Sequence, residues 1–555
     1  MRMNTKMHRK PFLAAVLITL IAFMAFNSPG EKYFEIAKNL DIFATLYKEV
    51  NAYYVDDVNP NNLMKEGIDA MLQSLDPYTN YIPEDDIEDY RTMTTGQYGG
   101  IGALIGRSNG RNIIVMPYLG FPAHESGLKI GDQIIKVDGI EVAEKSTSDI
   151  SKLLKGQANT ELELTIDRYG HKAPLTITLK REKITIDNVP YYGKVNDEIG
   201  YIKLSDFTTG AGKEVKNALE DLKSQGVKKI IFDLRDNPGG LLSEAVNVSN
   251  VFIEKGREVV HTKGKVSDWN KSYKALNSPI DAEIPLVVLT SSRSASAAEI
   301  VAGVIQDYDR GVLVGEKTFG KGLVQATRPL TYNSQLKITT AKYYIPSGRC
   351  IQAIDYSHRN EDGSVGKVPD SLKSVFYTKN GREVTDGGGV DPDLPVDRGN
   401  YAPITLSLVA KGLIFDYATI YAHNKPEIEN PRKFSLPDSE YEKFVDWLAD
   451  KDYDYTTKVE KTVEDLIDYA KKEKYYDDID QQIASLKQKV FHNKEQDLKK
   501  FKVEIKDLLE EEIASRYYLR EGMIEASFND DPQILKAIEV LSNQNEYSDL
   551  LAVNN

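Results

Sequence analysis

Short apolar strands alternate with helical stretches between about residues 190 and 400. Two of the strands are Lys229–Leu234 and Pro285–Thr290, and a run with the apolar spacing of a helix, Ala297–Tyr308, follows the second. Such alternation is typical of an α/β core, in which helices cover a sheet of buried strands. We therefore predict an α/β core over residues 184–400.

The other parts of the chain have different patterns. With 555 residues, the chain is too long for a single hydrophobic core. Residues 31–95 show apolar residues at helical spacing, residues 96–183 form short β-branched strands broken by glycines, and residues 401–555 are helical and highly charged. The predicted fold is a multidomain α+β arrangement with an N-terminal helical segment, a β domain, the α/β core and a C-terminal helical domain. The C-terminal helices favour a domain that packs on itself or on the core, and a homodimer contact or an adaptor surface is the alternative.

Composition excludes several classes of function. The formal net charge is −14 and there is no long basic run, which argues against nucleic acid as a partner. A single cysteine, Cys350, excludes an internal disulfide and a metal site built from several cysteines. We expect neither a metal nor a cofactor.

The N-terminus has the pattern of an export signal. Arg2, Lys6, Arg9 and Lys10 precede the uncharged run Pro11–Phe26. A basic stretch followed by an apolar one is typical of a signal peptide, here residues 1–30, and a cleaved signal and an uncleaved membrane anchor both remain open. The rest of the chain is therefore expected in the cell envelope, periplasmic or anchored to the membrane and facing away from the cytoplasm.

A glycine loop opens the β-rich segment. Tyr98-Gly-Gly-Ile-Gly-Ala-Leu-Ile105 runs into a strand, and Ser126-Gly-Leu-Lys-Ile-Gly-Asp-Gln-Ile-Ile-Lys-Val-Asp-Gly139 follows it. Together these stretches resemble a PDZ domain, whose glycine loop offers backbone N–H groups to the terminal carboxylate of a peptide. The resemblance implies a domain over residues 96–183, with protein or peptide substrates that have free C-termini as partners. The implied peptide-binding residues are Gly99, Gly100, Ile101 and Gly102.

Four serines lie within residues 291–296, and one of them could be a nucleophile. The strand that ends at Thr290 and the helix that begins at Ala297 place Ser296 at a helix start. Ser296-Ala-Ala-Glu299 matches a capping box, which requires no catalysis. A nucleophile at this place would also benefit from the helix dipole and from N–H groups able to hold an oxyanion. The pattern therefore permits chemistry without requiring it.

A base for such a serine must come from elsewhere in the chain. Gly315 to Lys321 matches a Walker A pattern except at its last position, where Gly322 offers no hydroxyl for Mg²⁺, and a strand follows where a helix is required. The other interpretation makes Lys321 a general base that accepts the proton of serine as a neutral amine. Its pKa would have to fall from about 10.4 by roughly three units, through desolvation.

Several further motifs occur in one order along the chain. They are Leu75-Asp-Pro-Tyr-Thr-Asn-Tyr81, Asp233-Leu-Arg-Asp-Asn-Pro-Gly-Gly240, Ser294-Ala-Ser-Ala-Ala-Glu299, Gly315-Glu-Lys-Thr-Phe-Gly-Lys-Gly-Leu-Val-Gln325, Pro346-Ser-Gly-Arg-Cys-Ile-Gln352 and Gly389-Val-Asp-Pro-Asp393. With the PDZ-like segment, they resemble the carboxy-terminal processing peptidases, also called tail-specific proteases, over roughly residues 35–400. This resemblance implies a serine protease with a Ser-Lys dyad and a crotonase- and ClpP-like α/β core.

The resemblance also implies site residues. By position, Ser296 matches the nucleophile, Lys321 the general base, and Gln325 the polar residue that orients the lysine. The backbone N–H groups of Gly239, Gly240 and Ala297 match the oxyanion hole. Asp307 matches an acidic position to which we assign no role. Two departures, at Ala298 and Cys350, leave the dyad intact.

Two other classes of function compete with a protease. One is a PDZ-type scaffold that binds tails around a non-catalytic core, and the other is a crotonase-like enzyme acting on acyl thioesters. The dyad itself makes a geometric demand, because Lys321 and Gln325 on a straight strand would lie about 13 Å apart. We therefore predict a bend or helical turn near Gly322.

Overall fold

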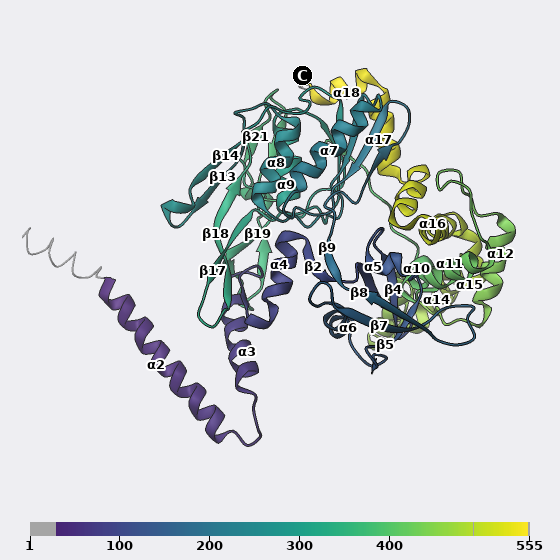
Figure 1. Ribbon diagram of the computed structural model, residues 1–555, viewed down its shortest axis with the longest axis horizontal. Coiled ribbons are helices and arrows are strands. Elements are labelled where there is room, and N and C mark those ends of the chain that lie inside the picture. The colour runs from purple at the N-terminus through teal and green to yellow at the C-terminus, as the bar shows by residue number, and fades with distance from the viewer. Residues whose placement is uncertain (1–28, 492, 553–555) are drawn as a thin grey trace, which may run out of the picture. The chain divides into compact units, whose positions relative to one another are not determined.

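The computed structural model describes residues 29–491 and 493–552 (Figure 1). The chain divides into two compact units, Met1–Tyr81 and Ile82–Asn555. The apolar run Pro11–Phe26 of the predicted export segment lies outside the described residues.

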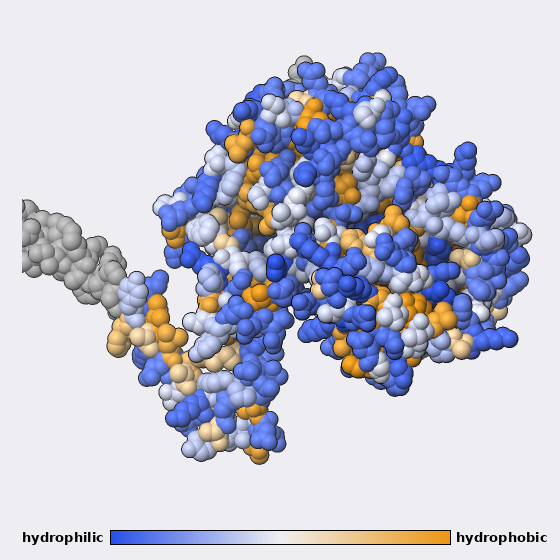
Figure 2. Space-filling view, in the orientation of Figure 1, coloured by the Kyte–Doolittle hydropathy of each residue, from blue (hydrophilic) through white to orange (hydrophobic). Residues whose placement is uncertain are grey.

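The described part of the first unit is helical. Helix α2 spans Pro29–Tyr53 and helix α3 spans Pro60–Gln73. Asn59 caps α3, since its side chain accepts hydrogen bonds from the backbone N–H groups of Asn61 and Asn62. Hydrophobic side chains remain exposed along α2 (Figure 2), among them Phe34 and Leu40. A short strand, β1 (Asn80–Ile82), includes the last two residues of this unit and the first residue of the next.

The second unit begins with helix α4 (Ile87–Thr95) and a β domain. One antiparallel sheet has the strand order β3-β4-β5-β7-β8, with β6 at the side of β5. Its elements are β3 (Ala103–Ser108), β4 (Arg111–Pro117), α5 (Pro122–Glu125), β5 (Gln133–Val137), β6 (Ile140–Glu141), α6 (Thr147–Leu154), β7 (Glu161–Asp167) and β8 (Leu175–Lys180). Alternate residues of β7, namely Leu162, Leu164 and Ile166, are buried, as expected for a sheet with one solvated face.

An antiparallel ribbon borders this domain in the sequence. Strand β2 (Gln97–Gly100) precedes the sheet and strand β9 (Glu182–Thr185) follows it. The two strands pair with each other, with Tyr98 opposite Ile184. The chain therefore enters and leaves the β domain through neighbouring strands.

A mainly parallel sheet forms the α/β core. Its strand order is β10-β11-β12-β15-β16-β23, and β11 to β23 run parallel. The strands are β10 (Tyr191–Lys194), β11 (Ile199–Lys203), β12 (Lys229–Asp233), β15 (Leu286–Thr290), β16 (Val312–Gly315) and β23 (Leu394–Pro395). Helices α7 (Ala211–Ser224), α8 (Leu242–Phe252) and α9 (Ala297–Asp307) share one hydrophobic core with the sheet.

The other face of the sheet is covered by the end of the chain. Helices α17 (Pro532–Ser542) and α18 (Gln544–Leu551) share a second core with the sheet residues that point away from α7, α8 and α9. In β12, Ile230 and Phe232 belong to the first core and Ile231 to the second. Burial on both faces explains the apolar runs in the middle of these strands, such as residues 230–232 of β12 and 286–289 of β15.

A second antiparallel sheet and two hairpins complete the core region. The sheet pairs β17 (Leu323–Pro329), β18 (Gln335–Tyr344), β13 (Glu258–Gly264) and β14 (Lys271–Lys274) in that order. The hairpins are β19 (Ile354–Arg359) with β20 (Val365–Lys367), and β21 (Val375–Tyr377) with β22 (Glu383–Thr385).

The C-terminal region is helical. Its helices before α17 are α10 (Pro403–Ala410), α11 (Leu413–Asn424), α12 (Asp438–Trp447), α13 (Lys458–Lys472), α14 (Tyr476–Val490), α15 (Lys494–Lys500) and α16 (Lys502–Ala526). Within the described residues, no single helix has the length and the apolar run that crossing a membrane requires; α10 and α11, bent by 64°, reach that limit only as a pair. Residues of this pair such as Leu408 and Ile414 are buried in the helical core. The predicted multidomain α+β fold is confirmed.

Helix α16 carries a half-buried acid, Glu511, among other acids. Burial, followed by the negative charges of Asp530, Asp531, Glu512 and Asp507, raises the pKa of Glu511 to about 8. In the unfolded chain the same carboxyl ionises near its ordinary value of 4.5. Unfolding therefore releases a proton between these two values, so the unfolding free energy falls as the pH rises from 4.5 to about 8 and the effect is complete above that pH.

We expect Glu511→Gln to stabilise the protein at pH 9 and to have almost no effect at pH 5, because glutamine resembles the protonated acid. The expected gain in unfolding free energy at pH 9 is about 2 kcal/mol. Urea unfolding of both proteins at the two pH values measures it. Glu521→Gln, which changes an exposed residue of the same helix, is the control. A difference between Glu511→Gln and wild type that does not change with pH would contradict this account.

Candidate active site

Ser296 lies in a strained turn between strand β15 and helix α9. Its backbone has φ 55° and ψ −112°, which L-residues rarely adopt and which costs about 1–3 kcal/mol. Ser296 is partly exposed, whereas Ser291 and Ser294 are buried. Strain in a strand-to-helix turn is typical of a serine held out for reaction.

The buried serines hold the loop in place. The Ser294 hydroxyl donates to Leu234 O at 2.8 Å and accepts the N–H of Ser291 at 2.9 Å. The Ser291 hydroxyl donates to Asp236 Oδ1 at 3.1 Å. Both side chains therefore tie the Ser296 loop to the turn that follows β12.

The carboxylate of Glu299 joins the Ser296 turn to the segment of Lys321. Glu299 Oε2 accepts the N–H of Ser296 at 2.8 Å and the N–H of Lys321 at 2.9 Å. Glu299 Oε1 accepts the N–H of Gly320 at 2.7 Å and the hydroxyl of Thr318 at 2.6 Å. The bond to Ser296 is the glutamate half of the predicted capping box. The bond to Lys321 brings the two predicted dyad residues to one side chain.

Burial raises the pKa of Glu299, while its hydrogen bonds act in the opposite direction. The side chain is fully buried. A buried acceptor that lost these donors would pay the full cost of desolvation. The four donors therefore hold Glu299, and Glu299 in turn holds the backbones of Ser296 and Lys321.

Tyr343, on strand β18, makes a second connection between the same two residues. Its hydroxyl lies 3.1 Å from Ser296 O and 2.8 Å from Lys321 O, and it donates toward both carbonyl groups. Burial, with the charge of Glu299 adding to it, raises the pKa of Tyr343 well above its usual range. The phenol thus keeps its proton and remains a donor.

Lys321 precedes strand β17 and does not belong to it. The pairing of β17 with β18 shifts register between Val324 and Gln325, and Gln325 Nε2 donates to Thr339 Oγ1 at 3.1 Å. Residues 321–325 are therefore not one straight strand, although the irregularity inside β17 comes two residues after Gly322, the predicted position.

The predicted oxyanion turn lies directly against Ser296. Gly239 and Gly240 have φ of 96° and 147°, and a Cβ on Gly239 would come within 2.8 Å of both Ala297 N and Ser296 Cβ. Glycine is needed here for its conformation and for the close approach.

One predicted oxyanion donor needs correction. The N–H of Gly239 already donates to Asn237 Oδ1 at 2.8 Å, so it is engaged within the turn. In the part of the chain that the structure describes, the N–H groups of Gly240 and Ala297 donate to no acceptor. Of the three predicted donors, Gly240 and Ala297 therefore have N–H groups available for an oxyanion. Gly239 instead allows the turn to approach Ser296 closely.

Three family descriptions match successive parts of the chain. "Peptidase family S41" matches residues 198–358, "PDZ domain" matches residues 114–168, and "Probable PDZ-protease, C-terminal helical domain" matches residues 404–541. A "Carboxy-terminal-processing protease" of Bartonella bacilliformis is 35% identical over 347 residues, which are 62% of this chain and 78% of that protein. The chain belongs to peptidase family S41.

Other similar proteins carry related descriptions. A "Probable CtpA-like serine protease" of Staphylococcus aureus strain MRSA252 is 35% identical over 61% of this chain and 68% of that protein. The solved structure of a "Photosystem II D1 C-terminal processing protease" is 27% identical, covers 64% of this chain and 92% of its own, and has a TM-score of 0.35. The predicted resemblance to the carboxy-terminal processing peptidases is confirmed, and the chain is a serine peptidase of family S41. Membership in the family argues against the acyl-thioester alternative.

The predicted tail-binding residues of this S41 peptidase lie in and after β2. Gly99 and Gly100 pair with β9, Ile101 is buried, and Gly102 has φ 71°. A Cβ on Gly102 would come within 2.5 Å of Phe121 Cβ. Packing alone thus accounts for glycine at position 102, and the family match to the PDZ domain begins beyond it.

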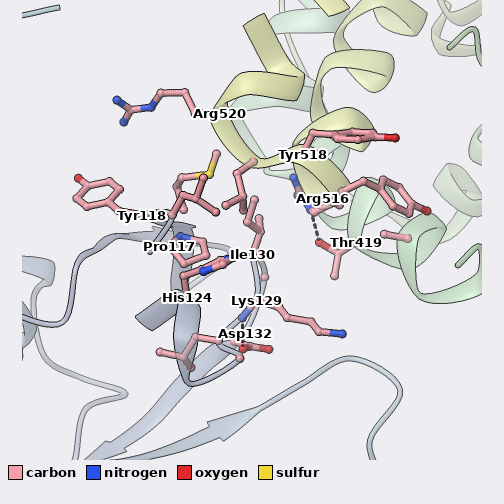
Figure 3. Close-up of a pocket in the computed structure, with 18 of the residues that line it drawn as sticks. Pro117, Tyr118, His124, Lys129, Ile130, Asp132, Thr419, Arg516, Tyr518 and Arg520 are labelled. Atoms are coloured by element: carbon pink, nitrogen blue, oxygen red, sulfur yellow. Dashed lines mark hydrogen bonds between the residues drawn. The ribbon is translucent and has the colours of Figure 1, made fainter. Parts of the chain in front are cut away.

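A separate cavity of about 850 Å³ lies between the β domain and helices α11 and α16 (Figure 3). Its wall includes Tyr118, Thr419, Arg516 and Arg520, and Arg516 Nε donates to Thr419 Oγ1 at 3.2 Å. Neither Ser296 nor Lys321 is among the described residues that line it. The cavity is thus distinct from the candidate active site.

We expect Tyr343→Phe to slow acylation of the active serine about 10-fold and to cost about 1–2 kcal/mol of unfolding free energy, because two buried carbonyl groups lose their shared donor. Mass spectrometry of the protein during reaction with a fluorophosphonate measures the acylation rate. Tyr344→Phe removes the hydroxyl of the next residue, whose ring stacks on His261, and serves as the control. Equal labelling rates for Tyr343→Phe and wild type would refute the role of the Tyr343 hydroxyl.

Proposed function

We propose that this S41 peptidase is an exported endopeptidase that recognises the C-terminal tails of proteins and cleaves them through an acyl-enzyme on Ser296. The observation that carries the proposal is the double connection between Ser296 and Lys321. Glu299 accepts the N–H groups of both residues, and the Tyr343 hydroxyl donates toward both of their carbonyl groups. A nucleophile and a base held by the same two side chains keep a constant relative position, which catalysis requires.

In the proposed reaction, the neutral amine of Lys321 removes the proton of the Ser296 hydroxyl as Oγ attacks the scissile carbonyl carbon. The N–H groups of Gly240 and Ala297 hold the oxyanion of the tetrahedral intermediate. The intermediate collapses with cleavage of the C–N bond, and the Lys321 ammonium gives its proton to the leaving amine. A water molecule, deprotonated by Lys321, then attacks the acyl-enzyme and releases the acid and the Ser296 hydroxyl.

Lysine can act as this base only when its amine is neutral at the working pH. The pKa of a lysine in water is about 10.4, and a fall of roughly three units costs about 4 kcal/mol. Lys321 is partly buried beside Gly322 and Leu323, which are buried, and desolvation lowers the pKa of a lysine. The role of Gln325 is to orient the amine from strand β17.

In this proposal, the PDZ domain binds the C-terminal tails of substrates. The N-terminal residues direct the protein to the cell envelope. The proposed contact for the terminal carboxylate is the segment Gly99–Gly102. The basic residues before Pro11–Phe26 support export to the cell envelope. The proposal includes both a periplasmic protein with a cleaved signal and a protein anchored through this run, and fractionation of cells that produce the full chain would distinguish the two.

We expect Ser296→Ala to abolish cleavage of a tailed protein substrate while unfolding near the wild-type temperature, since it loses about 1 kcal/mol at most from a helix cap. Ser292→Ala, which changes an exposed serine of the same loop, should cleave like wild type. Gel assays and thermal unfolding of the three proteins make the comparison. Cleavage by Ser296→Ala would show that another group is the nucleophile.

We expect Lys321→Arg to be as inactive as Lys321→Ala, because a guanidinium keeps its proton at any usable pH. Activity of the wild type should rise with pH through one ionisation below about 10.4. Single replacements of His124, His171, His261, His358, His423 and His492 should each retain most of the activity; His492 lies outside the described residues. A folded histidine variant as inactive as Lys321→Ala would mean that the base is a histidine.

We expect a substrate with an apolar C-terminal residue and a free carboxylate to be cut faster than the same substrate with an amidated end, because amidation removes the charge that backbone N–H groups hold. Initial rates at limiting substrate measure the difference. Equal rates would remove tail recognition from the proposal and leave the peptidase. Tight binding of the free tail with no cleavage by wild type would instead favour the non-catalytic scaffold.

A further inference from the structure

Arg235 connects the predicted oxyanion turn to the last part of the chain. It follows strand β12, and its side chain is only 4% exposed. On one side of the guanidinium, Nε and Nη2 donate to the carboxylate of Asp233 at 2.7–3.0 Å. On the other side, Nη1 donates to Asp531 Oδ2 at 2.6 Å and to Gln533 Oε1 at 3.0 Å. Asp531 and Gln533 belong to the N-terminus of α17, about three hundred residues further along the chain.

The turn after Arg235 is continuous with the candidate active site. Asn237 Nδ2 donates to Leu204 O at 2.8 Å, and Asn237 Oδ1 accepts the N–H of Gly239. Asn237 O accepts the N–H of Ala295, next to Ser296, at 2.9 Å. Arg235 therefore stands at the start of a short turn in which the N–H groups of Asp236, Asn237 and Gly239 are all hydrogen-bonded, and Gly240 follows directly.

A second contact leads from Gln533 to the same turn. Arg398 Nε donates to Gln533 Oε1 at 3.3 Å, and Arg398 Nη1 donates to Asp236 Oδ2 at 3.0 Å. Asp236 Oδ1 accepts from Arg293 of the nucleophile loop at 2.9 Å. Gln533 is fully buried, and its amide also donates to Val396 O at 2.7 Å. The Gln533 side chain thus contacts both Arg235 and Arg398.

We propose that Asp531 and Gln533 are positioning residues for catalysis, which act through Arg235 to hold the turn that presents the Gly240 N–H to the oxyanion. The inference rests on the proposed role of Gly240. It assigns to the C-terminal segment a contribution to the reaction rate that is separate from its covering of the sheet.

Asp531 allows the two contributions to be separated. Its Oδ1 caps α17 by accepting the N–H groups of Gln533 and Ile534 at 2.9 and 3.1 Å, while Oδ2 faces Arg235. Asparagine caps a helix as well as aspartate does. Its amide nitrogen, however, would replace Oδ2 and meet the guanidinium as a second donor. Asp531→Asn therefore keeps the cap and removes the contact to Arg235.

We expect Asp531→Asn to lower kcat about 10-fold, to leave KM within twofold, and to lower the affinity of a peptide boronic acid by a similar factor, because the tetrahedral boronate places an oxygen in the oxyanion site. Binding of a tail peptide to the full-length protein should not change. Gln533→Glu keeps an acceptor toward both arginines, and its kcat should stay within threefold of the wild-type value. Gln533→Met has no such acceptor, and its kcat should fall as much as that of Asp531→Asn. Asn543→Ala removes the cap of the neighbouring helix α18, where Asn543 accepts the N–H of Glu546, and should keep the wild-type kcat.

The outcomes separate this inference from the proposed function. Wild-type kcat and boronate affinity in Asp531→Asn would overturn the inference and leave the peptidase mechanism. A fall in kcat with an equal loss in Asn543→Ala, or with lost tail-peptide binding and a lower unfolding temperature, would overturn it in favour of a purely structural contact. A wild-type protein that neither cleaves a substrate nor binds the boronate would overturn the proposed function, and this inference with it.

Discussion

The buried carboxylate of Glu299 is the interaction on which the arrangement of the site depends. It accepts hydrogen bonds from two segments that lie about twenty residues apart in the sequence, the start of helix α9 and the loop between β16 and β17. A carboxylate in an apolar surrounding is stable only when its lone pairs are occupied, and here backbone N–H groups and a threonine occupy them. Moving either segment would leave the buried carboxylate without some of its donors. The free-energy cost of that loss holds the backbones of Ser296 and Lys321 in a fixed relative position.

The parallel sheet explains why these segments meet. Strands β12, β15 and β16 are neighbours and run in the same direction, so their carboxyl ends lie along one edge, where ligand sites of α/β sheets form. The loop after β12 carries Gly239 and Gly240, the loop after β15 carries Ser296, and the loop after β16 leads to Lys321. The antiparallel sheet contributes Tyr343 from β18. Each group of the site thus comes from an element whose place the sheet determines.

Much of this could be predicted from local sequence, and some of it could not. The position of Ser296 at a strand-to-helix junction follows from the apolar run before it and the helical spacing after it. The capping box predicted the bond between Glu299 and Ser296. That the same carboxylate reaches Lys321 depends on a loop twenty-two residues away, and no local pattern carries such information. The engagement of the Gly239 N–H by Asn237 was missed although a local pattern carries it, because an asparagine side chain commonly accepts the backbone N–H two residues further on, as it does in Asn237-Pro-Gly239.

The position of helix α17 on the sheet is the feature that sequence patterns predict least well. The residues of α17 have ordinary helical spacing, and nothing in that spacing says which surface they cover. The strands hold the information: β12 and β15 carry uninterrupted apolar runs, residues 230–232 and 286–289, which require cover on both faces, and α7, α8 and α9 cover only one face. Ile231, Val287 and Leu289 are buried by Ile534, Ala537 and Val540. Asp531 and Gln533 stand at the start of the helix that completes this core. Packing of α17 on the sheet therefore also places both side chains against Arg235. The sheet cannot bury its second face without also bringing an acid and an amide to the arginine beside the oxyanion turn.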